Sequence, residues 1–178
     1  MDGDGIMEKQ TSGGSYEQLD IKIITYEEPD YPSRQDAATL IAEQLSQVGF
    51  NVTIAVMEQS ELIKTMKSGD YDLALVGYYL SMAPDYTFML GSDGDSNLNG
   101  YSSAQMDAAL SDALTSVAES DFQSAIDHVQ MIVAQDLPVL SLYFRGGSLV
   151  SYLDMSSLDG LSELNTYNGL EYWQGVAG

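Results

Sequence analysis

The sequence predicts an α/β fold, with a mostly parallel sheet and helices on both faces, for three reasons. First, β-rich and helical segments alternate in the order β-α-β-α-β. Second, the third β-rich segment is apolar almost throughout, as expected for a strand covered on both faces. Third, a glycine follows each of the first two predicted helices, at the position that favours left-handed backbone. Parallel strands joined by right-handed crossovers are the simplest way to connect such a pattern.

The predicted strands are short runs rich in β-branched and aromatic residues, bounded by turn residues. The first three are LDIKIITY (residues 19–26), FNVTIAVME (50–58) and YDLALVGYYL (71–80), followed late in the chain by PVLSLYF (138–144) and GGSLVSYL (146–153). The last two are expected to add to the sheet after the final helix.

Four helices are predicted from capping residues and apolar stripes at helical spacing. We expect Ser33, Ser60, Ser103 and Ser120 to cap them, with Gly49, Gly69 and Pro138 marking ends. The expected buried stripes are Ala37, Ile41, Leu45 and Val48; Leu62, Ile63 and Met66; Met106, Ala109, Leu110, Ala113 and Val117; and Phe122, Ile126, Val129 and Val133.

Length and composition indicate one globular domain, residues 1–178, with a loop at residues 1–18 and an irregular tail at residues 154–178. Hydrophobic residues make up 44% of the chain, enough for a core. Acidic residues outnumber basic ones by 27 to 6, for a formal net charge of −21. Because such a surface repels phosphate backbones and anionic lipid, we expect no nucleic-acid partner. The first ten residues lack the basic and apolar regions of a signal peptide, and no apolar run is long enough to span a membrane.

The sequence offers little for catalysis or metal binding. There is no cysteine and only one histidine, His128, which is expected to be structural. DGDG (residues 2–5) fails the EF-hand pattern, and Asp93 with Asp95 is better explained as a solvated turn. No nucleophile or phosphate-binding motif is present. We therefore predict no catalytic residue, no metal site, no cofactor and no enzymatic activity.

A long polar segment at residues 81–101 is the best candidate for a ligand site. It follows the third strand, and ligands of open α/β sheets bind outside the carboxyl ends of the strands. Tyr78, Tyr79, Tyr86 and Tyr101 flank it or lie in it, and such rings make good ligand walls. Two alternatives remain open: a simple solvated connection, or tyrosines buried beneath the loop.

Several pieces, in order along the chain, resemble the C-terminal lobe of the family 5 extracellular solute-binding proteins of ABC importers. They are DGDGIMEK, AATLIAEQLSQVGFNVTI, MKSGDYDLALVGYYL, APDYTFML, NLNGYSSAQMDAAL and DLPVLSLYFR, which together span about Asp2 to Arg145. The resemblance implies one lobe of a type II periplasmic-binding-protein-like fold. It also implies a larger N-terminal lobe, absent here, so the chain is interpreted as a fragment of a two-lobed protein that closes on its ligand.

The same resemblance implies a role and a set of contacts. The protein would capture small molecules, most simply oligopeptides, outside the cytoplasm as a secreted protein or lipoprotein, and deliver them to the permease of an ABC transporter. In peptide-binding relatives an Asp in the loop after this strand pairs with the α-ammonium of the ligand, and Asp85 is the nearest carboxylate here. The ligand-binding residues expected are Tyr78, Tyr79, Asp85, Tyr86, Asn99, Tyr101 and Arg145.

Two other function classes compete with this interpretation. A stand-alone receiver- or flavodoxin-like module would need an acidic cluster at the first strand end and a suitably placed lysine. Tyr26-Glu27-Glu28 supplies acids, but no strand ends in that lysine. A hydrolase is a weaker alternative, since the nucleophile motifs are missing. Nickel chelates, sugars or other solutes remain possible ligands.

Overall fold

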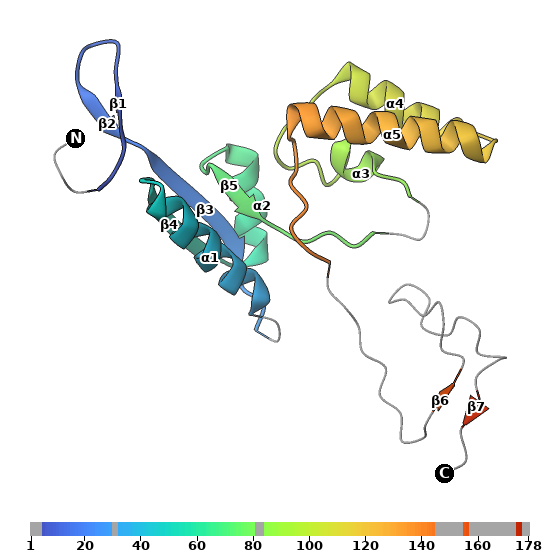
Figure 1. Ribbon diagram of the computed structural model, residues 1–178, viewed down its shortest axis with the longest axis horizontal. Coiled ribbons are helices and arrows are strands. Elements are labelled where there is room, and N and C mark those ends of the chain that lie inside the picture. Colours follow the sequence, from blue (N-terminus) through green and yellow to red (C-terminus); the bar gives the residue numbers. More distant parts are fainter. Residues whose placement is uncertain (1–4, 30–31, 81–83, 145–154, 157–173, 176–178) are drawn as a thin grey trace.

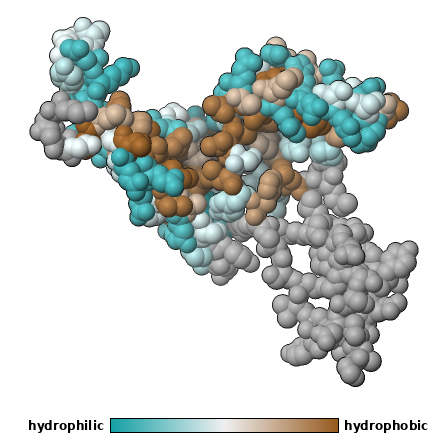
Figure 2. Space-filling model, viewed as in Figure 1, coloured by the Kyte–Doolittle hydropathy of each residue, from teal (hydrophilic) through white to brown (hydrophobic). Residues whose placement is uncertain are grey.

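The computed structural model describes residues 5–29, 32–80, 84–144, 155–156 and 174–175. Most of these residues form two parts that lie side by side (Figure 1). One part is a three-stranded sheet with two helices, and the other is a group of three helices. Apolar residues gather where the two parts meet, and polar residues cover much of the outer helices (Figure 2).

The sheet is parallel, as predicted. Strand β3 (Asp20–Tyr26) lies at its centre, between β4 (Asn51–Met57) and β5 (Leu73–Leu75). In the ladder Ile24 lies between Ala55 and Ala74. Strand β5 is much shorter than the predicted 71–80, because Leu75 pairs with Thr25 and β3 ends one residue later. Beyond the ladder Val76 still packs against the sheet core, whereas Tyr79 is exposed.

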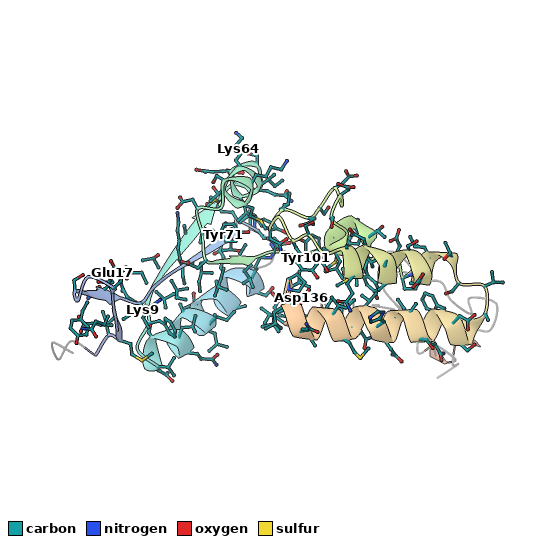
Figure 3. All side chains as sticks on the ribbon, turned by 90° about the horizontal axis from the view of Figure 1, so that it is seen from above. Lys9, Glu17, Lys64, Tyr71, Tyr101 and Asp136 are labelled. Atoms are coloured by element: carbon teal, nitrogen blue, oxygen red, sulfur yellow. The ribbon has the colours of Figure 1, made fainter. Side chains whose placement is uncertain are left out.

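Helices cover both faces of this sheet, which confirms the predicted α/β class. Helix α1 (Ser33–Gln47) and helix α2 (Gln59–Ser68) lie on opposite sides of the strands (Figures 1 and 3). Successive residues of a strand point to opposite faces. Ile24 packs with Leu62 and Met66 of α2, so Ile23 faces the α1 side; both isoleucines are fully buried.

The helix ends were predicted with mixed success. Gly49 and Gly69 both adopt positive φ, 94° and 74°, at the ends of α1 and α2 as expected. The caps assigned to Ser33, Ser60 and Ser120 are wrong, because each helix begins earlier than its serine pattern suggested. Pro32, Glu58 and Ala118 occupy the cap positions, and none makes a side-chain capping bond.

The second part packs three helices around an apolar core. These are α3 (Thr87–Leu90), α4 (Ala104–Thr115) and α5 (Glu119–Asp136). The core holds Leu90, Met106, Ala109, Leu110, Val129 and Ile132, which confirms the predicted inward face of α4 up to Ala113. The prediction that Val117 is buried on this face is wrong, because Val117 lies beyond the end of α4 and is fully exposed.

In α2 Leu62 and Met66 are buried as predicted, whereas the stripes predicted for α1 and α5 are displaced around their helices. In α5 the buried residues are Ala125, Val129 and Ile132, whereas Phe122, Ile126 and Val133 are half-buried. In α1 the buried residues are Arg34 and Ala38, while Ala37, Ile41 and Leu45 are half-buried and Val48 is exposed. A buried arginine in the first turn of α1 was not foreseen.

Ser103 is the one serine cap that the structure confirms, and it yields a testable prediction. Its hydroxyl accepts a hydrogen bond from the Met106 amide at 3.3 Å. Ser103→Ala is expected to lower the free energy of unfolding by about 1 kcal/mol, the usual cost of a lost cap. Urea denaturation measures it, with Ser120→Ala as the matched control, because Ser120 lies inside α5 and caps nothing. Equal losses in the two variants would contradict the assigned role.

The two ends of the described chain differ from the expected loops. Strands β1 (Glu8–Gln10) and β2 (Tyr16–Gln18) form an antiparallel hairpin within the predicted loop at residues 1–18, with Lys9 beside Glu17 (Figure 3). Strand β6 (Met155–Ser156) pairs with β7 (Gln174–Gly175) in the predicted tail.

The strand predicted at residues 138–144 is not formed. That segment has no regular structure, and Leu140 and Phe144 are 76% and 80% exposed. Its β propensity alone does not make a strand without a partner to complete the ladder. The strand predicted at residues 146–153 lies outside the described residues. No helix in the described ranges is long and apolar enough to cross a bilayer.

Candidate functional site

The candidate site lies at the carboxyl edge of the parallel sheet. Strands β3, β4 and β5 all end there, and Glu27 and Glu58 directly follow the first two. After β5 the chain continues through Tyr78 and Tyr79 towards α3. The loop at residues 91–101 then bridges both parts of the molecule: Leu98 packs against the sheet core, and Tyr101 packs against the helical core.

Asp85 lies one residue before Tyr86, the N-cap of α3, and bonds to the first residue of the helix. Its Oδ1 accepts hydrogen bonds from the Thr87 amide at 2.9 Å and from the Thr87 hydroxyl at 2.6 Å. These bonds from the Thr87 hydroxyl and amide lower the pKa of Asp85. The carboxylate is therefore ionised at neutral pH. Both bonds from Thr87 go to Oδ1, so they leave Oδ2 available to another donor.

Tyr78 connects the chain after β5 to the polar loop. Its hydroxyl donates to the Ser96 carbonyl at 3.3 Å, and its ring meets the Phe88 ring edge-on, with centroids 5.8 Å apart. Burial raises the pKa of Tyr78, and the neighbouring Tyr71 adds to the rise. Tyr78 thus stays protonated at neutral pH and fixes the position of the loop against α3.

The two tyrosines on either side of residues 81–83 have opposite environments. Tyr79 is 94% exposed. Tyr86 is half-buried and packs against the core formed by α3, α4 and α5. Of the two, only Tyr79 offers its ring to a molecule arriving from solvent.

Asn99 and Tyr101 both bond to the C-terminal end of α5 and the residues just after it. The Asn99 amide donates to the Pro138 carbonyl at 2.8 Å, and the Tyr101 hydroxyl donates to Asp136 at 2.6 Å (Figure 3). Burial, followed by the bond to Asp136, raises the pKa of Tyr101. Both side chains are committed to anchoring the loop on the segment after α5.

The loop itself is built tightly on α3. Asn97 donates through Nδ2 to the carbonyls of Gly91 and Tyr101, and the Ser96 amide donates to the Phe88 carbonyl. The two acidic residues of the loop, at positions 93 and 95, are exposed, as for a solvated turn. In the described part of the chain no group of three or more acidic or histidine side chains is arranged to hold a metal ion.

A buried cation at the same edge was missed in the sequence. Arg34, 5% exposed, forms an ion pair with Glu28 at 2.8 Å, and its guanidinium lies 4.0 Å above the Tyr26 ring. A Cβ at Gly77 would lie 2.8 Å from Arg34 Nη2, so the glycine admits the guanidinium between the ends of β3 and β5. The only signal available beforehand was this glycine inside an otherwise continuous apolar run.

The seven predicted site residues therefore fall into separate groups. Tyr78, Asp85 and Tyr86 surround α3, whereas Asn99 and Tyr101 lie at the end of α5. Tyr79 stands alone on the surface. Arg145 lies outside the described residues. Exposed carboxylates border the edge, and Arg34, the described cation there, is already paired, so the edge is electrostatically suited to a positively charged group.

A parallel sheet flanked by helices, with a structured loop at the carboxyl ends of its strands, is the architecture of a binding-protein lobe. The family model described as "Bacterial extracellular solute-binding proteins, family 5 Middle" matches residues 4–100, more than half of the chain. The chain therefore belongs to the family 5 bacterial extracellular solute-binding proteins. This confirms the resemblance found in the sequence, in place of the stand-alone receiver- or flavodoxin-like module.

Individual relatives agree with the family. The oligopeptide-binding protein AppA of Bacillus subtilis is 25% identical over 145 residues, which cover 79% of this chain and 27% of AppA. Its structure in complex with a nonapeptide superposes with a TM-score of 0.62, over 77% of this chain and 27% of that one. The oligopeptide-binding protein of Thermus thermophilus with a pentapeptide, 19% identical, gives a TM-score of 0.66 over 80% of this chain and 27% of that one.

A nickel binder shares the fold as well. NikZ of Campylobacter jejuni, solved with Ni(L-His), gives a TM-score of 0.56 at 14% identity, over 74% of this chain and 28% of that one. The chain thus spans about a quarter of the length of each of these relatives.

Proposed function

We propose that the chain is one lobe of the substrate-binding component of an ABC importer, and that it captures oligopeptides by closing against a larger N-terminal lobe. The observation that carries the proposal is the family match, which covers the sheet and the loop that follows it. Binding is reversible and breaks no bond, so the protein is not an enzyme. Its place of action is outside the cytoplasm, where it passes ligand to the permease.

The choice of peptides rests on the charge of the site. Asp85 presents an ionised carboxylate at the start of α3, in the segment that follows β5, and the exposed Glu27 and Glu58 follow the other two strands. The α-ammonium of a peptide would form a charge-assisted hydrogen bond with the Asp85 carboxylate. The exposed ring of Tyr79 would pack on the ligand, while Tyr78, Asn99 and Tyr101 would position the loop. AppA of Bacillus subtilis, named for oligopeptides, supports the same class.

The experiment that tests this proposal is mass spectrometry of whatever co-purifies with the protein expressed from its complete reading frame. Peptides of mixed sequence are the expected result. A single non-peptide solute would keep the importer role and replace peptides as its cargo. A reading frame with no second lobe would contradict the two-lobed mechanism.

Asp85→Asn tests the contact directly. Asparagine keeps an oxygen for the two bonds from Thr87 and removes only the charge, so the fold should be retained. We expect peptide affinity to fall by about tenfold or more, because hydrogen bonds to charged groups contribute roughly 1.5–3 kcal/mol. Isothermal titration calorimetry with a recovered peptide measures it. Asp93→Asn, on the exposed turn, is the control and should change nothing.

The pH dependence follows from the lowered pKa of Asp85. Its carboxylate stays ionised below the pH, about 4, at which an ordinary aspartate protonates. Binding through this group should therefore persist as the pH falls from 7 to about 5. A loss of affinity in the native protein over that interval, with the fold intact, would assign recognition to another group.

A further inference from the structure

Strand β4 leaves a row of backbone groups without partners at the edge of the sheet. The Asn51 amide donates to Leu19, and the Met57 carbonyl accepts from Glu27, so both residues turn their backbone towards β3 and its flanks. Backbone groups alternate sides along a strand. Val52, Ile54 and Val56 therefore direct their N–H and C=O groups outward, and no described residue bonds to them there.

This edge lacks the usual protection against pairing. Natural edge strands are typically short, or carry lysine, proline or a bulge. Strand β4 runs for seven residues, NVTIAVM, with no charged residue and no proline. Ile54 and Val56 are 37% and 42% exposed. Although the chain has a net charge of −21, this edge carries no charge, so a second strand can pair with it without charge repulsion at the ladder.

We propose that β4 pairs antiparallel with β4 of a second copy of the chain, about a two-fold axis at Ile54. In this register Ile54 faces Ile54 of the other copy, and Val52 faces Val56. These are the residues whose backbone groups point outward, so each pair exchanges hydrogen bonds. Cross-strand pairs of β-branched residues stabilise such a ladder, and no charged side chain faces another across it.

The symmetry of the strand favours a second copy over any other occupant. A two-fold interface requires a patch that complements itself, and the order Val, Thr, Ile, Ala, Val supplies one. The sheets of the two copies would become one continuous sheet of six strands, with both α1 helices on the same face.

The surface beside the edge fits this arrangement. A groove of about 530 Å³ lies between α1 and β4, lined by Thr39, Ala42, Glu43, Ser46, Gln47 and Ile54. Most of the α1 residues in it are small or uncharged, so the two helices can approach. Glu43 is the charged exception, and pairing would bring one from each copy near the axis. The dimer is therefore weak at low ionic strength and becomes tighter with salt.

A single engineered thiol tests the register, because the chain has no cysteine of its own. A hydrogen-bonded antiparallel pair places its Cα atoms about 5.5 Å apart, within the range of a disulfide. In high salt and mild oxidant, the Ile54→Cys variant should form linked dimers at least about tenfold faster than Val117→Cys, since pairing raises the effective concentration of the thiols. Val117 is fully exposed beyond the end of α4 and serves as the control.

Sedimentation velocity on the 178-residue chain provides the second measurement. The native dimer fraction should rise with salt, rise further in Glu43→Gln, and vanish in Ile54→Lys but not in Val117→Lys. Equal linking rates at positions 54 and 117 would overturn the proposal. So would a chain that is monomeric at every salt concentration. None of these outcomes depends on the transport role.

Discussion

Arg34→Met is expected to lower the free energy of unfolding by about 3 kcal/mol, the scale found when one partner of a buried ion pair is removed. The Arg34 side chain is 6% exposed, and that of its partner Glu28 is 20% exposed. Methionine fills much of the space over the Tyr26 ring but supplies no charge. The carboxylate of Glu28 would then remain largely buried without its cation, and the cost of that burial is what the variant measures.

Two further variants make this measurement specific. Lys22→Met removes an exposed ion pair, since the Lys22 and Asp70 side chains are 37% and 75% exposed, and should cost less than about 1 kcal/mol. Adding Glu28→Gln to Arg34→Met should recover part of the loss, because it removes the buried negative charge that the Arg34 guanidinium balanced. Urea denaturation of all three settles the comparison. If Arg34→Met lost no more stability than Lys22→Met, the buried pair would contribute nothing beyond a surface contact.

This arginine also shows where prediction from the sequence stops. The sheet, its parallel order and the helices on both faces followed from the sequence, because the spacing of apolar residues distinguishes strands from helices and glycines mark the helix ends. A charged residue in the first turn of a helix is normally solvated. Only the three-dimensional meeting of Tyr26, Glu28 and Gly77 at the strand ends explains its burial.

The site residues divide along the same line. The polar segment at residues 81–101 was singled out by its polarity and its place after a strand, and Asp85 by the family resemblance; that Thr87–Leu90 would form a helix inside it was not predicted. What each tyrosine does could not be predicted, because a ring over a ligand and a ring in a core have the same residue type. In the structure Tyr86 packs against the helical core, the Tyr101 hydroxyl donates to Asp136, and Tyr79 is exposed.

Gly94→Ala is the second change with a large expected effect. A Cβ at Gly94 would lie 2.5 Å from the Thr87 carbonyl oxygen and 2.6 Å from that of Phe88. Both are backbone atoms of α3, which cannot rotate away as a flexible side chain does, so the loop must separate from the helix. We expect a loss of about 2 kcal/mol in the free energy of unfolding, in the range for overpacked sites.

The control for this variant is Gly13→Ala in the β1–β2 hairpin, where the nearest atom to the new Cβ, Thr11 Oγ1, lies at an ordinary 3.9 Å. A local measurement separates loop displacement from general loss of stability. The Ser96 amide, bonded to the Phe88 carbonyl at 2.8 Å, should exchange its hydrogen faster in Gly94→Ala than in the native protein, while exchange of the sheet amides should change less. Because Tyr78 bonds to the Ser96 carbonyl, the same displacement would also break this hydrogen bond. Unchanged exchange at Ser96 would mean that α3 yields instead of the loop.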